Sequence, residues 1–324
     1  MTTTLISSPL QSFTDYRFRN AFQKYFGGID FFYAPYIRMN GKLVIKPLYE
    51  RDLALKNNKS ITVVPQIMTC SAEEFIFAAR YVRSLGYDEL NWNLGCPYPM
   101  VTTKGLGSGL IARPADINHI LQRVHEETDI VVSMKMRLGY DTSDEILDTL
   151  PVLARYPIRS VAVHARIGKQ LYRGGVDLAA FAQCLRQSEF PVYYNGDIKT
   201  VADYRRMQEL FPSVTHWLLG RGLIADPCLP EMIKADTDEY PTDRMDRFGK
   251  FHDTLQYQYQ EKLSGDKHVI MKMYSYWEYF ATSMSAPAKI LKKIKKCKTL
   301  SAYDEAVSEI LLSKQQSSIT TNQY

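Results

Sequence analysis

The sequence has few cysteines, and the five that it contains are scattered without a Cys-x-x-Cys pair. This pattern suggests neither a disulfide framework nor a thiolate zinc site, so we expect no bound metal and a reducing, cytoplasmic compartment. No apolar run approaches the length that spans a bilayer, and no charged segment followed by an apolar one begins the chain. We therefore expect a soluble protein without a membrane partner.

Two further absences concern ligands. No Gly-x-Gly-x-x-Gly fingerprint follows a predicted strand, so a dedicated dinucleotide-binding domain is not expected. The net charge is only +5, which is compatible with an anionic partner but not with a polybasic binding tail. With 324 residues, 45% of them hydrophobic, the chain is long enough for one large domain and a smaller companion.

Up to about residue 230 the chain alternates short β-branched runs with longer segments of helical periodicity, which is typical of repeated βα units. The eight predicted strands are Leu5–Ser8, Phe31–Tyr36, Ile61–Ile67, Glu89–Asn93, Val131–Met136, Ser160–His164, Val192–Tyr194 and Trp217–Leu219. The intervening helices include Ala72–Leu85, Pro114–Thr128, Asp144–Arg155 and Thr200–Leu210. Eight such units favour an α/β fold of the TIM (β/α)8 barrel type over a doubly wound sheet.

After about residue 240 the sequence predicts helices without strands between them, namely Asp243–Leu263, His268–Ser283, Pro287–Lys295 and Ser301–Ser313. We expect a barrel domain over residues 1–238, a small all-helical domain over 239–316 and a disordered tail over 317–324. The segment 289–298 combines many lysines with apolar residues at helical spacing. It is either a solvated amphipathic helix or a surface for phosphate backbones, with Lys272, Lys292 and Lys293 as candidate contacts.

Polar residues gather where the predicted strands end, which is where the active sites of such barrels lie. They are Gln66, Asn93, Lys135, Arg137, His164, Arg166 and Asn195-Gly196-Asp197. Each has an ordinary explanation when taken alone, such as turn formation or a buried core histidine. Together, cationic and amide groups that converge on one face of a barrel indicate a site for an anionic ligand rich in heteroatoms.

A glycine-rich turn, Gly220-Arg221-Gly222, follows the last predicted strand. Barrels commonly bind phosphate at this point through backbone N–H groups. Together with Asn195-Gly196-Asp197 one strand earlier, the turn favours a phosphorylated cofactor. Since no dinucleotide-binding domain is expected, we predict a mononucleotide.

The turn Gly95-Cys96-Pro97 is the most informative short segment. Gly95 can adopt backbone angles closed to other residues and Pro97 fixes φ, so we expect the turn to hold Cys96 and to lift its thiol into the open. A reactive cysteine would be presented in this way. A free cysteine is more often a small core residue, and that alternative stays open at this point.

These segments resemble, in the same order, the motifs of the tRNA-dihydrouridine synthases. The most specific similarity is to the family pattern N-x-G-C-P … K … G-[SA]-x-L, which is matched by Asn93-Leu94-Gly95-Cys96-Pro97, Lys104 and Gly107-Ser108-Gly109-Leu110. The family's opening segment resembles Ser8-Pro9-Leu10, Thr14-Asp15 and Phe18-Arg19. Further similar blocks are Ser133–Gly139, His164-Ala165-Arg166, Asn195–Ile198 and Gly220-Arg221-Gly222.

Some positions depart from the family pattern without removing a chemical group. Leu10 stands where the family usually has Met, and Met68 and Ala165 stand where Gly is common. The segment Phe32–Ile37 also lacks the acidic residue often found after the second strand. One substrate or loop contact is therefore not expected there.

The resemblance implies an enzyme that uses FMN to reduce specific uridines of tRNA to 5,6-dihydrouridine, with NADPH or NADH as reductant. Hydride would pass from flavin N5 to uracil C6, and Cys96 would donate the proton to C5. The implied cofactor-binding residues are Ser8, Pro9, Leu10, Gln66, Lys135, His164, Asn195, Gly196, Asp197, Gly220 and Arg221. The implied substrate-binding residues are Asn93, Lys104, Arg137, Arg166, Lys272, Lys292 and Lys293.

Two other functions remain open, and we expect the protein to be a monomer whichever function applies. Another FMN-dependent barrel, similar to a dihydroorotate dehydrogenase, would act on a small pyrimidine and would not need the lysine-rich helical segment. A non-catalytic tRNA-binding protein of the same fold would not need Cys96, Lys135 and His164 together. Activity on tRNA compared with a free pyrimidine would separate these possibilities.

Overall fold

A computed structural model describes residues 3–320 of the chain and the side chains of residues 3–312. The chain divides into two compact units. The first contains the residues up to Tyr16, Ile29–Ile198 and Arg205–Gly220. The second contains Arg17–Gly28, Lys199–Tyr204 and the chain from Arg221 onward.

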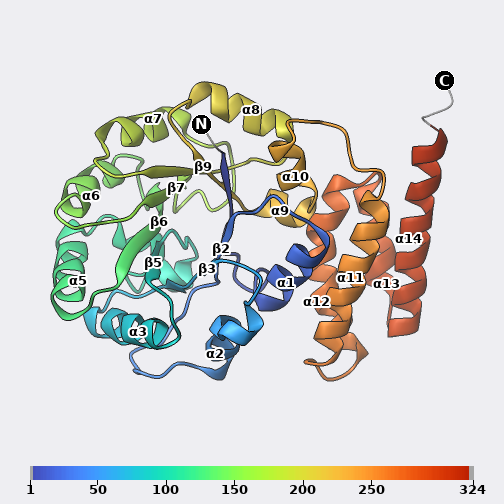
Figure 1. The fold of residues 1–324 in the computed structure, drawn as a ribbon, viewed down its shortest axis with the longest axis horizontal. Coiled ribbons are helices and arrows are strands. Elements are labelled where there is room, and N and C mark those ends of the chain that lie inside the picture. Colours follow the sequence, from blue (N-terminus) through green and yellow to red (C-terminus); the bar gives the residue numbers. More distant parts are fainter. Residues whose placement is uncertain (1–2, 321–324) are drawn as a thin grey trace. The chain divides into compact units, whose positions relative to one another are not determined.

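The first unit is a barrel of parallel strands (Figure 1). The strands are β1 (Thr4–Ser7), β2 (Phe31–Tyr33), β3 (Val63–Val64), β4 (Gln66–Ile67), β5 (Glu89–Leu94), β6 (Val131–Gly139), β7 (Val161–Ile167), β8 (Val192–Asn195) and β9 (His216–Leu219). Their order is β3-β2-β1-β9-β8-β7-β6-β5-β4, and every pair is parallel. The predicted TIM-barrel architecture is confirmed.

The third predicted strand, Ile61–Ile67, is interrupted at Pro65, which separates β3 from β4. Proline has no N–H to donate to a neighbouring strand, and this explains the break. Because β3 and β4 are consecutive in the chain but stand at opposite ends of the strand order, the sheet closes on itself. A parallel bridge between Ile37 and Ile67 continues the pairing beyond β2.

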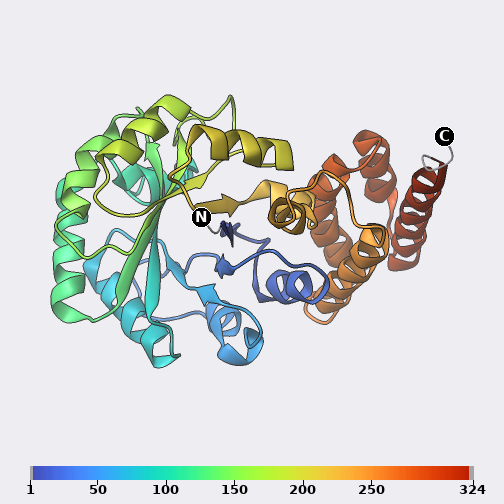
Figure 2. The ribbon, with the colours of Figure 1, turned by 45° about the horizontal axis from the view of Figure 1, so that its top comes forward.

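The helices of the first unit surround the strands, and Figure 2 shows α3, α5, α6 and α7 in an arc outside them. These helices are α2 (Pro47–Leu53), α3 (Ala72–Ser84), α4 (Pro99–Thr102), α5 (Pro114–Glu127), α6 (Glu145–Leu153) and α7 (Leu178–Gln187), with the short 3-10 helices η1 (Leu55–Asn57) and η2 (Gly107–Leu110). Helix α8 (Val201–Leu210) contributes residues to both units.

The interior of the barrel is filled by side chains from five strands. The cluster consists of Ile6, Tyr33, Val64, Ala162 and Leu218, each at most 8% exposed. Burial of such apolar surface is the main stabilising term for a barrel. It also blocks the interior, so a ligand can bind only at an end of the barrel.

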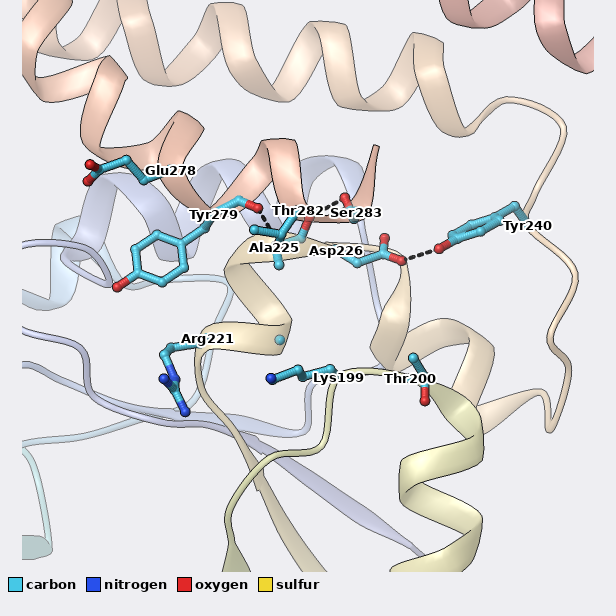
Figure 3. Close-up of a pocket in the computed structure, with 11 residues that line it drawn as sticks. Lys199, Thr200, Arg221, Ala225, Asp226, Tyr240, Glu278, Tyr279, Thr282 and Ser283 are labelled. Carbon is cyan, nitrogen blue, oxygen red and sulfur yellow. Dashed lines mark hydrogen bonds between the residues drawn. The ribbon is translucent and has the colours of Figure 1, made fainter. Parts of the chain in front are cut away.

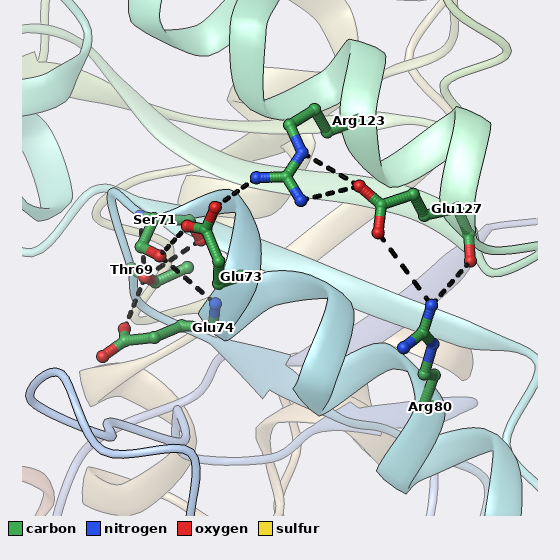
Figure 4. A network of polar contacts seen from close by, with 7 residues as sticks. All are labelled: Thr69, Ser71, Glu73, Glu74, Arg80, Arg123 and Glu127. Atoms are coloured by element: carbon green, nitrogen blue, oxygen red, sulfur yellow. Dashed lines mark hydrogen bonds and ion pairs between the residues drawn. The ribbon is translucent and has the colours of Figure 1, made fainter.

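A polar network joins α3 and α5 on the outside of the barrel (Figure 4). Arg123 donates to Glu127 one turn later (2.7 Å) and also pairs with Glu73 of α3. These charges are partly exposed, so they contribute little to stability. Glu74, by contrast, is 8% exposed and accepts the backbone N–H of Gly41 (2.5 Å), which ties the loop after β2 to α3.

The second unit is entirely helical in its described part. Its helices are α1 (Tyr16–Tyr25, apart from its first residue), α9 (Arg221–Ala225), α10 (Leu229–Lys234), α11 (Arg244–Gln260), α12 (Asp266–Phe280), η3 (Ala281–Ser283), α13 (Pro287–Lys296) and α14 (Leu300–Thr320). Helix α14 thus extends into the stretch predicted to be a disordered tail, of which residues 321–324 lie outside the described part. The independence of residues 239–316 as a domain stays a prediction.

Aromatic packing explains why α1 belongs to the helical unit. Phe18 stacks on Tyr276 of α12, with ring centroids 6.1 Å apart, and meets Phe251 of α11 edge-on at 5.7 Å. In the same core, Trp277 Nε1 donates to the hydroxyl of Tyr303 (2.8 Å). Helices from both ends of the sequence are therefore joined in one core. No helix within residues 3–320 combines the length and apolar character needed to cross a membrane.

Candidate functional site

The carboxyl ends of β4 to β8 bring the predicted polar residues to one mouth of the barrel. The strand register places Asn93 beside Lys135, and Arg137 beside His164. His164 in turn lies beside Asn195 of β8. Because all the strands run in the same direction, these side chains share one end of the sheet.

A row of buried amides crosses from β4 to β6 at this mouth. Asn93 Nδ2 donates to Gln66 Oε1 (2.8 Å), and Gln66 Nε2 donates to Asn91 Oδ1 (2.7 Å). Asn91 Nδ2 then donates to Ser133 Oγ (2.9 Å). A buried hydrogen-bond network of this kind fixes the orientation of each member. Sequence reasoning missed Asn91, although it lies two residues before Asn93 and so on the same face of β5.

The Cys96 turn is held from both sides. Asn93 Oδ1 accepts the backbone N–H groups of Gly95 (3.1 Å) and Cys96 (3.0 Å). The carbonyl oxygen of Cys96 accepts the N–H (3.0 Å) and the hydroxyl (3.2 Å) of Ser108. Gly107 has φ +57° and packs so closely that an added Cβ would lie 2.5 Å from the same carbonyl oxygen. The turn therefore has little freedom to move.

The prediction that this turn lifts the thiol into the open is wrong, because Cys96 is only 8% exposed. Its side chain packs with Met68 and Val101, and the hydroxyl of Tyr36 lies 4.0 Å from Sγ. Leu106, from the segment that folds back against the turn, packs on the same cluster. Burial, followed by the neighbouring Cys96, raises the pKa of Tyr36, so the phenol is neutral. Tyr36 was missed, although it ends a predicted strand.

Lys135 is a buried lysine at the mouth, and its protonation depends on what binds beside it. Its Nζ donates to Asn195 Oδ1 (2.9 Å), and Asn195 Nδ2 donates to the carbonyl of Leu218 (2.9 Å). Burial lowers the pKa of Lys135 to about 7, with a further contribution from Arg137 and an opposing one from Cys96. An anion bound beside it would favour the charged form.

Arg137 connects the loops at the mouth of the barrel through hydrogen bonds. Its Nε donates to the carbonyl of Gly95 (3.1 Å) and its Nη1 to that of Ile167 (2.8 Å), while the guanidinium lies 5.3 Å from the centre of the Tyr172 ring. Burial lowers the pKa of Arg137 to about 10, so it remains charged at neutral pH. The Tyr172 ring lies 6.1 Å from that of His164. Sequence reasoning missed Tyr172, whose only signal is its place shortly after His164.

Arg166 and Asp197 neutralise each other. Arg166 is 1% exposed; its Nη1 donates to Asp197 Oδ1 (3.1 Å), and its Nη2 pairs with the other carboxylate oxygen. Nη2 also donates to the carbonyl of Gly174 (2.8 Å), and Nη1 lies 3.1 Å from His164 Nε2. The two side chains thus fix the loops after β7 and β8. Their predicted roles toward cofactor and substrate stay predictions.

Ser8 offers a hydrogen-bonding group at the end of β1. Its backbone N–H donates to Leu219 (2.8 Å), whereas its buried hydroxyl has no hydrogen-bond partner within the described part of the chain. Gly220 adjoins it, and an added Cβ there would lie 3.6 Å from Ser8 Cβ. Arg221, the next residue, begins α9 in the second unit. A polar ligand could satisfy the Ser8 hydroxyl.

The other predicted residues of the first unit lie on loops. Pro9 and Leu10 are partly exposed, and the Leu10 N–H donates to Thr14 Oγ1 (2.9 Å). Lys104 is exposed between α4 and η2. Within the described residues, no group of three or more His, Cys, Asp or Glu side chains could hold a metal ion.

The predicted substrate-binding lysines of the second unit lie on two helices, α12 and α13. Lys272 Nζ lies 4.6 Å from the ring centre of Tyr276 and 5.0 Å from that of Tyr259. Helix α13 buries Ile290 and Ile294 and directs lysines to its other faces. Lys292 is exposed, whereas Lys293 pairs with Glu309 of α14.

Comparison with known proteins gives matches over most of the chain. The family described as "Dihydrouridine synthase (Dus)" matches residues 5–316. A "tRNA-dihydrouridine(16) synthase" of Cupriavidus necator is 30% identical over 247 residues, which cover 74% of this chain and 76% of the relative. A "tRNA-dihydrouridine(16) synthase" of Pseudomonas syringae pv. tomato is 31% identical over 239 residues, which cover 70% of this chain and 74% of the relative. The solved structure of "Morphinone reductase" shares the fold, with a TM-score of 0.50 at 12% identity over 76% of this chain and 88% of that one.

Proposed function

Because the chain belongs to the dihydrouridine synthase family, we propose that it reduces uridine in tRNA to 5,6-dihydrouridine, with FMN as cofactor and NADPH or NADH as reductant. The single observation that supports this best is the position of Cys96. Its turn is fixed by Asn93 and Ser108 at the same mouth of the barrel as Lys135 and His164. A proton donor and an anion-binding group thus share one site.

The residues of the mouth fit FMN. The buried hydroxyl of Ser8, which has no hydrogen-bond partner among the described residues, lies beside Gly220 and suits a polar ligand. Gln66, Lys135 and His164 would face the isoalloxazine, and Asn195, Gly196, Asp197 and Gly220 would surround the ribityl phosphate. The carboxylate of Asp197 is occupied by Arg166, so its backbone would face the phosphate. Arg221 remains a candidate on the sequence pattern.

The chemistry requires a hydride and a proton on the two carbons of one double bond. FMN, when bound and reduced, supplies the hydride to C6 of uracil. Cys96 Sγ holds the proton for C5, and the surrounding Met68 and Val101 keep water from the thiol. Asn93 positions this thiol through its oxygen and keeps one N–H, beyond that given to Gln66, for a uracil carbonyl. Charged Lys135 stabilises negative charge that develops at the site.

We propose position 16 as the uridine that is modified, since the two relatives compared above are described by that position. Dihydrouridine would be mapped in tRNA from a strain that lacks this protein. We expect loss at position 16 and retention elsewhere. Loss at another position would reject the assigned position, and unchanged tRNA would reject the function.

Cofactor affinity is expected to fall as the pH rises above about 7. In the apoprotein Lys135 loses its proton near this pH, far below its ordinary value of 10.5, because it is buried. The isoalloxazine would accept a hydrogen bond from the charged amine and so favour the protonated form. Binding then takes up a proton, and affinity falls by up to about tenfold per pH unit. FMN titration of the apoprotein between pH 6.5 and 9 measures this. Lys135→Gln, which cannot titrate, should flatten the profile; equal slopes would contradict the role of Lys135.

Neutralising four lysines of α13 is expected to weaken tRNA binding and to flatten its dependence on salt. Each phosphate contact that is lost should lower the slope of log K against log salt by about 0.9. The variant replaces Lys292, Lys293, Lys295 and Lys296 with Ala, and its control replaces them with Arg. Because Lys293 already pairs with Glu309, Lys292→Ala alone should cost more affinity than Lys293→Ala. An unchanged salt slope in the Ala variant would show that α13 is a solvated amphipathic helix that does not contact tRNA.

A further inference from the structure

The second unit contains a cavity of about 550 Å³ (Figure 3), and of the residues that line it only Arg221 is also a candidate for the proposed cofactor site. Every residue that lines it belongs to this unit. Its walls are the turn before α8, helix α9 with Tyr240, and the end of α12 with η3. The volume lies within the range of about 300–1,000 Å³ that is usual for small-molecule sites, so it can hold more than a single phosphate.

One wall of the cavity is cationic. Lys199 and Arg221 both lie on it, and Figure 3 shows their charged ends directed toward the same region. The backbone N–H groups of Lys199 and Thr200 each donate to Asp203 Oδ2 (3.0 Å), so the start of α8 is capped by the protein itself. Attraction for an anion therefore comes from the side chains, and Lys199 is exposed and able to reach a ligand.

The opposite wall offers an acceptor and an aromatic ring. Asp226 is already engaged, because it accepts the hydroxyl of Tyr240 (2.7 Å) and lies 3.6 Å from Arg244. The exposed carboxylate of Glu278 and the partly exposed ring of Tyr279 also line the cavity. A ligand that fits both walls is anionic at one end and has hydrogen-bond donors and a flat surface at the other.

We propose that the cavity binds one nucleotide of the tRNA substrate other than the uridine that is reduced. Its phosphate lies at the Lys199 wall, and its ribose and base lie at the Glu278 wall. Ribonucleotides donate hydrogen bonds through the 2′-hydroxyl and base amino groups, and their bases stack on tyrosine. A bare phosphate would leave the Glu278 wall unoccupied, and an acidic peptide would place a second anion against Glu278. The inference rests on the proposed function and adds a second point of attachment for the same substrate.

The test compares Lys199→Ala with Lys250→Ala in the full-length holoenzyme. Lys250 is an exposed lysine of α11 that does not line the cavity and pairs with Asp246 (2.6 Å). Binding of unmodified tRNA is measured at several salt concentrations. Lys199→Ala should weaken binding by about tenfold and lower the salt slope by about one, as expected for a charged hydrogen bond to phosphate. Lys250→Ala should have a much smaller effect.

The variant Glu278→Gln shows whether the carboxylate of Glu278 binds the nucleotide or repels RNA. If the carboxylate accepts a hydrogen bond from the nucleotide, the variant binds tRNA more weakly; if it only repels RNA, the variant binds more tightly and the proposal is overturned. Equal affinities of the two lysine variants would also overturn it. A third result would also overturn it. If Lys199→Ala binds tRNA as the wild type does but its flavin is reduced more slowly by NADPH in the absence of tRNA, the cavity binds the reductant. Wild-type protein that fails to reduce tRNA would instead reject the proposed function.

Discussion

Cys96→Ala is expected to lower dihydrouridine formation by about 10²–10⁴-fold, the usual contribution of a general acid. Bound flavin should stay at the wild-type level, because the side chain packs against Met68 and Val101 rather than against the residues proposed to hold the cofactor. Both quantities are measured on the purified protein, the first with unmodified tRNA and the second by flavin absorbance.

The matched control is Cys184→Ala, which removes a fully buried thiol from α7. It should lose some stability, as buried truncations do, but not activity. Undiminished activity of Cys96→Ala would show that the proton reaches C5 from another source. Loss of flavin from that variant would show that the turn serves the cofactor and not the proton.

Gly107→Ala is expected to lower activity by about 10²-fold, the effect that a displacement of about 1 Å can have on a reacting group. The added Cβ would lie 2.5 Å from the carbonyl oxygen of Cys96 and 2.9 Å from its Cβ, so the turn must move. Flavin content should be unchanged. Steady-state kinetics with tRNA measures the effect.

Gly265→Ala is the control variant for the effect of a positive φ without a close neighbour. Gly265 has φ +78°, but an added Cβ there meets nothing within 4 Å. Both variants therefore carry similar backbone strain, and only Gly107→Ala forces a neighbour to shift. If the two variants had the same activity, the close packing of Gly107 on the thiol turn would have no part in catalysis.

The barrel could be predicted because its strands are short β-branched runs separated by helical segments, a pattern that each segment shows by itself. The break at Pro65 also follows from one residue, since proline cannot pair through its nitrogen. The packing of α1 with α11 and α12 could not be predicted. It depends on contacts such as Phe18 with Tyr276, which are more than two hundred positions apart.

At the barrel mouth, sequence position indicated which residues end the strands but not how they pair. The salt bridge between Arg166 and Asp197 joins two loops, and the hydrogen bond between Lys135 and Asn195 joins β6 to β8. Such pairs follow from strand register and loop geometry rather than from local pattern. The burial of Cys96 was missed for the same reason, because it depends on contacts with Met68, Val101 and Leu106, which lie on other segments.

The most direct test of the central claim is a single-turnover reaction. The purified protein is reduced in the absence of oxygen and mixed with unmodified tRNA or, separately, with free uridine, and dihydrouridine is quantified against flavin. The account predicts about one dihydrouridine per flavin in tRNA and far slower reaction of free uridine. Equal rates with both substrates, or no dihydrouridine in tRNA, would contradict it.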